Sequence, residues 1–276
     1  MHKQTFGATL KKIRKSKNIS QKALSEGLCS QPMLSSIENG KYIPNSNLLI
    51  GLCQKLGIQA DTLVLQDHFK ISSSFEYSKQ AQNLCNQHKY QELKDFLESD
   101  DVLQSIDTSS EYQAYYYYLG CSEYHLDSTL TASESDFQLV LAENQSNGAP
   151  NTLSRLALGG LGLIYARKQQ TALSKKFADL SLDQISNTLY EENLNILFYL
   201  KAYGEFLNGR FLSAATTIDE GISFITQHHS IYMLANLYFL LATVTDKSIS
   251  EEELAEARHR SNIFEELYNE KIFKKI

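Results

Sequence analysis

The stretch ISQKALSEGLCSQPMLSSIENGK, residues 19–41, carries the signals for two short helices joined by a tight turn. Ser20 and Ser30 each stand where a helix begins, and a serine hydroxyl there accepts a hydrogen bond from a backbone N–H that lacks a partner. Gly27 lies between the two helices and can adopt the left-handed backbone that a tight bend needs. Gly40 provides a stop for the second helix. The stretch therefore predicts a helix-turn-helix unit.

Helices are predicted on both sides of this unit. Before it, Phe6, Leu10 and Ile13 recur at the spacing of one helix face, with basic residues on the other side. After it, the apolar pattern predicts a helix over Ser46–Leu56 and a last turn at residues 61–65. Together these elements predict a small helical bundle around one apolar core.

Charge is distributed unevenly along the chain of 276 residues, whose formal net charge is −6. Residues 1–66 contain nine Lys or Arg and three Asp or Glu, which gives +6, so the remainder carries −12. A small basic module joined to a larger acidic body indicates that one end meets a polyanion such as nucleic acid. A solvated basic face without a partner is the alternative that charge alone leaves open.

Three segments of the basic module resemble the phage-repressor (Cro/CI, XRE-type) helix-turn-helix. They are ISQKALS (19–25), LSSIENGK (34–41) and LGI (56–58), with Pro44 between the last two. The insert GLCSQ (27–31) resembles in particular the RNPP group of peptide-regulated transcription regulators, the Rgg and PlcR type of Gram-positive bacteria. Pro32 and Met33 depart from this pattern, because such regulators more often carry polar residues there. The resemblance covers about the first 65 residues and implies a DNA-binding domain.

In this motif the second short helix enters the major groove with its N-terminal residues on the base edges. Gln31 is placed to pair with an adenine edge, whereas Met33 offers only apolar contact, for instance to a thymine methyl group. Gln21, at the N-terminus of the preceding helix, is placed to hold a phosphate. The candidate DNA-binding residues are Gln21, Ser30, Gln31, Met33, Ser35, Ser36, Lys41 and Tyr42. For the two adjacent serines, solvation of a helix face is the alternative.

Beyond residue 67 the periodicity stays helical, and small residues recur at intervals of 39, 40, 42 and 40. The small residues are Ala81, Gly120, Gly160, Ala202 and Ala242, and twelve residues after each stand Leu93, Ala132, Ala172, Ala214 and Leu254. Paired helices approach closely only where one partner is small. The pattern resembles a degenerate tetratricopeptide repeat (TPR) of five copies, each longer than the usual length of about 34 residues.

The sequence as a whole therefore predicts an all-α fold, in which a lambda-repressor-like helix-turn-helix bundle precedes a TPR-like α-solenoid of about five helical hairpins. An irregular helical domain with chance spacings is the alternative. The predicted boundaries are 1–67 for the DNA-binding domain, 68–75 for a linker that contains Ser72-Ser73-Ser74, and 76–276 for the peptide-sensing and dimerisation domain. Within the latter, residues 144–151 are expected to form an inter-repeat loop and 251–268 a closing helix.

A stacked array of hairpins leaves a concave groove lined by the first helix of each hairpin. Tyrosine combines an apolar ring with a hydroxyl, and an asparagine such as Asn236 can clamp a peptide backbone, because its amide both donates and accepts. The candidate peptide-binding residues are Tyr117, Tyr165, Asn195, Tyr199, Tyr203, Asn236 and Phe239. For each tyrosine, packing between helices is the alternative. In RNPP regulators this groove binds a short signalling peptide, and the resemblance implies the same here.

Several classes of function find no support. The chain contains no P-loop, no H-E-x-x-H motif and no Cys/His cluster at metal-ligand spacing, so we expect neither an enzyme nor a cofactor. The pair His228-His229 has no third ligand nearby. Four scattered cysteines and the lack of an export signal favour buried thiols in the cytoplasm. The longest uncharged apolar run, residues 231–244, is too short to span a bilayer.

These observations predict a cytoplasmic, sequence-specific transcription regulator controlled by a short signalling peptide, as in quorum sensing. Its expected partners are a double-stranded DNA operator, the peptide and a second copy of the chain, because one short recognition helix reads too few bases. RNA polymerase is a further candidate partner, and no membrane is expected. The alternative is a phage- or plasmid-type repressor whose helical domain only dimerises or binds a protein, without a peptide ligand. Activation and repression are both compatible with the sequence.

Overall fold

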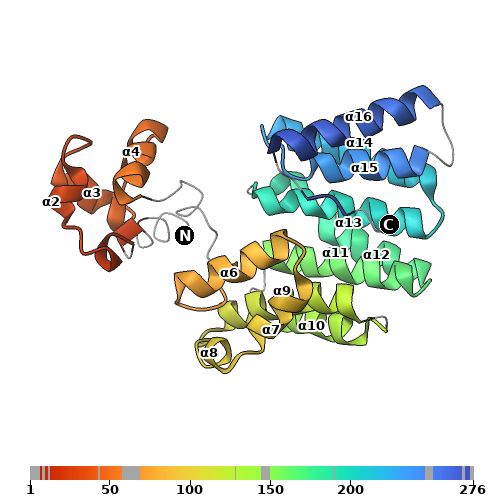
Figure 1. The fold of residues 1–276 in the computed structure, drawn as a ribbon, viewed down its shortest axis with the longest axis horizontal. Helices are drawn as coiled ribbons and strands as arrows, with labels where there is room; N and C mark the ends of the chain where they lie inside the picture. Colours follow the sequence, from red (N-terminus) through yellow and green to blue (C-terminus); the bar gives the residue numbers. More distant parts are fainter. Residues whose placement is uncertain are drawn as a thin grey trace. The chain divides into compact units, whose positions relative to one another are not determined.

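A computed structural model describes residues 7, 10–11, 13–42, 44–57, 69–127, 129–143, 150–188, 190–245, 251–268 and 271–273. Contacts divide the chain into two compact units, residues 1–67 and 68–276. Within the residues described, all regular elements are helices, which confirms the predicted all-α class (Figure 1).

The first unit is a small bundle built around the helix-turn-helix. Its helices are α2 (Gln21–Ser25), α3 (Gln31–Glu38) and α4 (Ser46–Leu56), and residues 13–16 are helical before them. Its core consists of apolar side chains of α2, α3 and α4 together with Leu10, and Ile13 packs against it; the core residues are Leu10, Leu24, Leu34, Ile37, Leu52, Cys53 and Leu56. Phe6 and the predicted turn at residues 61–65 lie outside the described residues.

The predicted caps set the starts of α2 and α3. The hydroxyl of Ser20 accepts a hydrogen bond from the N–H of Ala23 at 3.1 Å, and the hydroxyl of Ser30 accepts one from the N–H of Met33 at 3.3 Å. Between the helices Gly27 has φ of +72°, in the left-handed region that a side chain disfavours. Local sequence signals therefore fix the geometry of the helix-turn-helix.

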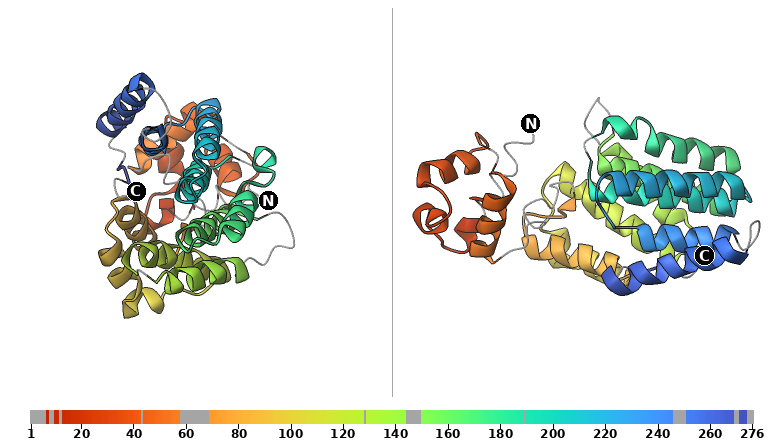
Figure 2. Two further views of the ribbon diagram at one scale, coloured as in Figure 1. Left: turned by 90° about the vertical axis from the view of Figure 1, so that its right-hand side faces the viewer. Right: turned by 90° about the horizontal axis from the view of Figure 1, so that it is seen from above.

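The second unit is a row of antiparallel helix pairs that follow one another in chain order (Figure 1 and Figure 2). The pairs are α6 (Phe75–Asn86) with α7 (Tyr90–Leu97), α9 (Ser109–Leu126) with α10 (Thr131–Ala142), α11 (Thr152–Arg167) with α12 (Thr171–Leu182), α13 (Asn195–Leu207) with α14 (Phe211–Gln227), and α15 (Leu234–Thr245) with α16 (Glu251–Tyr268). Shorter elements are α8 (Asp100–Leu103), η2 (Ile185–Asn187) and η3 (Glu192–Leu194). The five predicted hairpins are thus confirmed.

Small residues at the predicted anchor positions admit a large side chain between hairpins. A Cβ atom added to Gly120 would lie 2.9 Å from Cε1 of Phe137, and one added to Gly160 would lie 2.6 Å from Cε2 of the same ring. Phe137 comes from α10 and is buried between α9 and α11. Because the ring has a glycine on both sides, it has no room to move away from an added methyl group.

The stretch 68–75, predicted as a linker, contributes to the core of the second unit. Phe69 and Ile71 are buried in that core, and Ser72 is also buried, with its hydroxyl accepting a hydrogen bond from the N–H of Ser74 at 3.0 Å. The reason is that burying the two apolar side chains against the first hairpins is more favourable than leaving them exposed to water in a linker. Most of the predicted loop 144–151 lies outside the described residues, whereas the closing helix α16 has the predicted bounds.

Candidate DNA-reading surface and peptide groove

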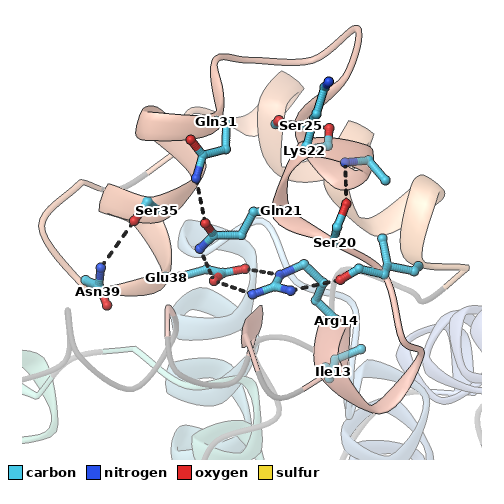
Figure 3. Close-up of polar contacts among 12 residues, drawn as sticks. Ile13, Arg14, Ser20, Gln21, Lys22, Ser25, Gln31, Ser35, Glu38 and Asn39 are labelled. Carbon is cyan, nitrogen blue, oxygen red and sulfur yellow. Dashed lines mark hydrogen bonds and ion pairs between the residues drawn. The ribbon is translucent and has the colours of Figure 1, made fainter.

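A buried ion pair connects the helix before α2 to the end of α3 (Figure 3). Arg14 donates from Nε to Oε1 of Glu38 at 2.6 Å and from Nη2 to Oε2 at 2.9 Å. Its Nη1 also donates to the carbonyl of Ile19 at 2.8 Å. Burial alone would raise the pKa of Glu38, but the hydrogen bonds from Arg14 and Gln21 outweigh it and hold that pKa below its usual value. The pair therefore stays charged and fixes α3 against the preceding helix.

Two glutamines extend this network to the protein surface. Gln21 donates from Nε2 to Oε2 of Glu38 at 2.8 Å, and Gln31 donates from Nε2 to Oε1 of Gln21 at 2.8 Å (Figure 3). Gln21 is the first residue of α2 and Gln31 the first of α3, so this bond joins the N-termini of the two helices. The two amides were candidates for separate reasons, and the structure brings them together as one polar unit.

The other candidates on α3 have mixed roles. Ser30 is exposed and caps the helix, and Met33 is partly buried in contact with the core. Ser35 is partly buried, and its hydroxyl accepts a long hydrogen bond of 3.5 Å from Nδ2 of Asn39. Asn39 is exposed beside it and was not a candidate from the sequence, although its spacing of four residues from Ser35 places both on one helix face.

After α3 the chain turns around one carbonyl group. The backbone N–H groups of Lys41 and Tyr42 both donate to the carbonyl of Ser36, at 2.8 and 3.2 Å. The turn leaves the side chains of Lys41 and Tyr42 exposed next to the end of the helix, while Ser36 is partly buried. An exposed ammonium group and phenol at this place can contact a phosphate.

In the second unit, Asn236, which the sequence proposed as a clamp for a bound peptide, holds a backbone segment of the chain itself. Its Oδ1 accepts a hydrogen bond from the N–H of Phe273 at 3.0 Å, and its Nδ2 donates to the carbonyl of Lys271 at 3.3 Å. Asn236 lies on α15 and is only 2% exposed. The clamped segment is residues 271–273 of the chain itself, which we call the C-terminal segment.

The C-terminal segment inserts an aromatic ring among residues of other hairpins. The Phe273 ring stacks on His88 with centroids 4.2 Å apart and on Tyr199 with centroids 5.3 Å apart. His88 comes from the turn between α6 and α7, and Tyr199 from α13. Beyond His88, Tyr90 stacks on His125 of α9 at 3.8 Å. These rings define an aromatic slot, which consists of His88, Tyr90, His125 and Tyr199.

The two histidines of the slot are held in their neutral form. Removal from water lowers the pKa of His88 to about 4, and the positive charge of Lys271 acts in the same direction. Removal from water also lowers the pKa of His125 to about 4, and the positive charges of His88 and Arg167 act in the same direction. His125 as a residue is exposed, but its ring lies against Tyr90, so the ring itself has lost much of its hydration. Neutral imidazole rings suit a slot that accepts an aromatic side chain.

Two of the predicted groove residues instead pack between helices. Tyr117 is buried, with its ring 5.9 Å from that of Phe69 and 6.3 Å from that of Phe137. Tyr165 donates from its hydroxyl to Oε1 of Glu134 at 2.6 Å and stacks on Phe177 at 5.3 Å. These rings fill the spaces that neighbouring hairpins leave, which is the alternative that the sequence left open for every tyrosine.

Asn195 also has a structural role. Its Nδ2 donates to the hydroxyl of Ser230 at 3.3 Å and to the carbonyl of Tyr232 at 3.1 Å, so it fastens the connection between α14 and α15. Tyr203 remains beside the slot, with its ring 6.0 Å from that of Tyr199, and Phe239 is partly buried on α15. Of the candidates from the sequence, Asn236 and Tyr199 contact the C-terminal segment, and their role in peptide binding stays a prediction. The sequence missed His88, Tyr90 and His125, whose proximity depends on how distant hairpins stack.

Other classes of site find no counterpart in the part of the chain that the structure describes. No three His, Cys, Asp or Glu side chains there gather as metal ligands would. The His228 ring stacks on that of Tyr190 at 4.0 Å. No described helix is both long enough and apolar enough to span a membrane.

Comparison with known proteins supports both units. Residues 10–63 match the family model described as helix-turn-helix. No curated protein sequence matches the chain. Among solved structures, PlcR of Bacillus thuringiensis in complex with the peptide PapR7 and DNA has 22% identity and a TM-score of 0.61, over 96% of each chain. The apo form of PlcR has 17% identity and a TM-score of 0.58, over 96% of this chain and 95% of that one. ComR of S. thermophilus, in complex with DNA and its signalling peptide ComS, has 16% identity and a TM-score of 0.50, over 96% and 94%.

These identities are low, so the likeness to PlcR and ComR concerns the fold, and it extends over nearly the whole chain. The predicted resemblance to RNPP regulators is confirmed at that level. Residues 10–63 match the helix-turn-helix family, and the chain as a whole has the fold of PlcR, a protein solved in complex with a peptide and DNA.

Proposed function

We propose that this protein is a sequence-specific DNA-binding transcription regulator whose activity is controlled by a short signalling peptide in the groove of its helical domain. The observation that carries the proposal is the pairing of two sites in one chain. One is a helix-turn-helix with a hydrogen-bonded amide pair on its surface, and the other is the aromatic slot, beside which Asn236 holds the backbone of the chain's own C-terminal segment.

For DNA, the amide pair supports a role in base and phosphate recognition. A glutamine can make two hydrogen bonds to an adenine edge in the major groove, and each such bidentate contact discriminates by about 1–3 kcal/mol. Gln21 already holds Gln31, so less side-chain freedom is lost when DNA binds. PlcR and ComR have each been crystallised with DNA, and we extend that role to this chain by its fold.

For the peptide, the support is the chemistry of the groove. Asn236 recognises backbone atoms, which every peptide has, and the aromatic slot recognises a side chain. PapR7 and ComS are peptides bound by PlcR and ComR, and we infer a ligand of the same class here. We further propose a homodimer in the cytoplasm, since paired recognition helices multiply affinity for paired half-sites. We expect no catalysis, and RNA polymerase is a further partner that we propose.

DNA binding is tested by fluorescence anisotropy of the full chain with DNA fragments from the region upstream of its own gene. We expect Gln31→Ala to lower the discrimination between the best fragment and a scrambled one by roughly 10-fold or more. Gln54→Ala, which removes an exposed glutamine of α4, is the matched control. Unchanged discrimination in Gln31→Ala removes this residue from the base-reading set.

Peptide binding is tested by isothermal titration of the full chain with short apolar peptides from small open reading frames beside the gene. We expect binding at micromolar concentration or tighter to one peptide, weakened in Asn236→Ala and unchanged in Asn262→Ala, which alters an exposed residue of α16. DNA binding of both variants should persist. If none of these peptides binds while DNA binding persists, the protein is instead a repressor whose helical domain only dimerises or binds a protein.

A further inference from the structure

We propose that residues 271–273 are an internal ligand of the peptide groove, which an incoming signalling peptide has to displace. The proposal rests on the proposed function, because it concerns the regulation of the same groove. It is carried by where this segment lies and by which atoms hold it.

The contacts to the backbone are those that a foreign peptide would receive. Asn236 accepts from the N–H of Phe273 and donates to the carbonyl of Lys271, so it reads the two backbone groups on either side of Ile272. Neither bond involves a side chain of the segment. A buried amide that loses its partners is costly, so a segment that replaces this one has to offer the same N–H and C=O pair. The clamp is therefore selective for a peptide backbone.

The side chains of the segment also lie in buried surroundings. Ile272 is buried, and the ring of Phe273 stacks between His88 and Tyr199. A ligand that takes this place should carry an aromatic side chain directly after a large apolar one. The hydroxyl of Tyr199 is buried and has no hydrogen-bond partner among the residues that the structure describes. A peptide that brings a polar group to this hydroxyl gains a contact that the C-terminal segment does not make.

The segment also joins the two ends of the row of hairpins. Lys271 donates from Nζ to the carbonyl of Gln87 at 2.5 Å, next to His88 in the first hairpin, while Asn236 belongs to the last hairpin. Replacing the segment by a peptide that lacks the Lys271 contact would release the first hairpin from the last. Occupancy of the groove is thereby coupled to the curvature of the helical domain.

The first test uses tryptophan fluorescence, since the chain contains no tryptophan. Phe273→Trp places a single reporter in the slot, and Leu267→Trp places one on α16 at a residue that is 70% exposed. We expect the acrylamide quenching constant of Phe273→Trp to be at least threefold smaller than that of Leu267→Trp. Adding Asn236→Ala to Phe273→Trp should raise its constant toward that of Leu267→Trp, whereas adding Asn262→Ala should not. Equal constants in the two reporter proteins overturn the proposal.

The second test measures competition in the full chain. The probe is a fluorescent, acetylated hexapeptide KIFKKI, the sequence of residues 271–276. We expect Phe273→Ala to bind the probe at least 10-fold more tightly than the unaltered chain, because the internal ligand is weakened. Leu267→Ala is the control and should bind it like the unaltered chain. Equal binding to Phe273→Ala and the unaltered chain, or no binding to either, overturns the proposal.

The two proposals fail in different ways. If Phe273→Trp is as accessible as the control while a peptide still binds through Asn236, the groove is a peptide site without an internal ligand. If Phe273→Trp is protected and no peptide encoded beside the gene binds, the segment occupies the groove permanently and the proposed peptide control is wrong. Circular dichroism melting curves of all variants identify any loss of activity caused by unfolding.

Discussion

Replacing Glu38 by glutamine tests whether the buried ion pair holds the DNA-reading surface together. The carboxylate accepts three hydrogen bonds, from Nε and Nη2 of Arg14 and from Nε2 of Gln21, at 2.6, 2.9 and 2.8 Å. Its side chain is 0% exposed and that of Arg14 is 9% exposed. In Glu38→Gln one acceptor becomes an NH₂ group that faces donors, and the buried guanidinium loses its compensating charge.

Removing one partner of a buried pair costs about 3–5 kcal/mol. A glutamine keeps one acceptor oxygen, and Arg14 keeps its bond to the carbonyl of Ile19, so we expect the lower end, about 3 kcal/mol. One factor of 10 corresponds to about 1.4 kcal/mol, so amides that exchange only when the first unit unfolds should exchange on the order of 100-fold faster. The second unit should be unaffected, because the pair lies wholly within the first.

The assay is hydrogen–deuterium exchange followed by mass spectrometry, which compares fragments covering α2–α3 with fragments covering α11–α12. The chain contains a matched control in the pair Arg260–Glu256, where Nε and Oε1 are 2.7 Å apart but the side chains are 50% and 57% exposed. An exposed pair contributes about 0–1 kcal/mol, so Glu256→Gln should change exchange by less than about fivefold.

Two results would refute this reasoning. One is equal exchange in Glu38→Gln and Glu256→Gln, which would mean that burial does not strengthen the pair. The other is a loss of protection in both units of Glu38→Gln, which would mean that the substitution destabilises the chain globally. The double variant Arg14→Met/Glu38→Met removes both charges and should recover much of the lost stability, since apolar replacements of a buried pair are often neutral.

Three further predictions concern the second unit. Gly160→Ala should destabilise it by about 1–2 kcal/mol in urea unfolding, since the new Cβ meets the Phe137 ring at 2.6 Å. Gly204→Ala, whose Cβ would have 3.7 Å of clearance, should stabilise it by about 0.5–1 kcal/mol, and a result of the same sign for both contradicts the packing argument. Burial and nearby carboxylates raise the pKa of Asp136 to about 7, so the folded state binds the extra proton and stability falls as pH rises from about 4 to 7. Asp136→Asn should remove roughly 2–3 kcal/mol of the difference in unfolding free energy between pH 5 and pH 8, and an unchanged difference refutes the assignment. The pKa of His88 is lowered to about 4 where the C-terminal segment is docked, so His88 binds a proton less readily in the docked state than in the released state. Docking therefore weakens as pH falls from about 6.5 toward 4. Emission of Phe273→Trp should shift to the red from pH 7 to pH 5, and emission that does not change with pH contradicts this.

The helices and their hairpins could be predicted from the sequence because their causes are local. Ser20 and Ser30 cap the helices that follow them, and each acts within three residues of its own position. Small anchors such as Gly120 and Gly160 recur at one interval because each hairpin has to pack on the next in the same way. A rule that repeats along the chain is visible in one sequence.

The groove could be predicted only in part, because its contacts join residues that are far apart in the chain. Asn236 was proposed from its chemistry, since few side chains can clamp both a donor and an acceptor, and the structure places it on a backbone segment of the chain itself. Nothing in the sequence indicates that His88, His125 and Phe273 share one slot, because that depends on the curvature accumulated over several hairpins. Tyr165 shows the opposite limit. Its position suits the groove, yet the carboxylate of Glu134 and the ring of Phe177 hold it between helices.

An internal ligand changes what a loss of affinity means in this protein. A peptide can bind only those molecules in which the groove is open, so its apparent affinity is the intrinsic affinity multiplied by the open fraction. A segment docked in about 99% of molecules would weaken apparent binding about 100-fold. Asn236→Ala removes a contact from the peptide and from the segment alike, so the two effects partly cancel in the measured affinity. Phe273→Ala weakens only the segment, and the double variant Asn236→Ala/Phe273→Ala therefore measures the contribution of Asn236 to the peptide alone. If Asn236 serves both ligands, its loss should cost more affinity in the Phe273→Ala background than in the unaltered chain, and equal losses would mean that it serves only one.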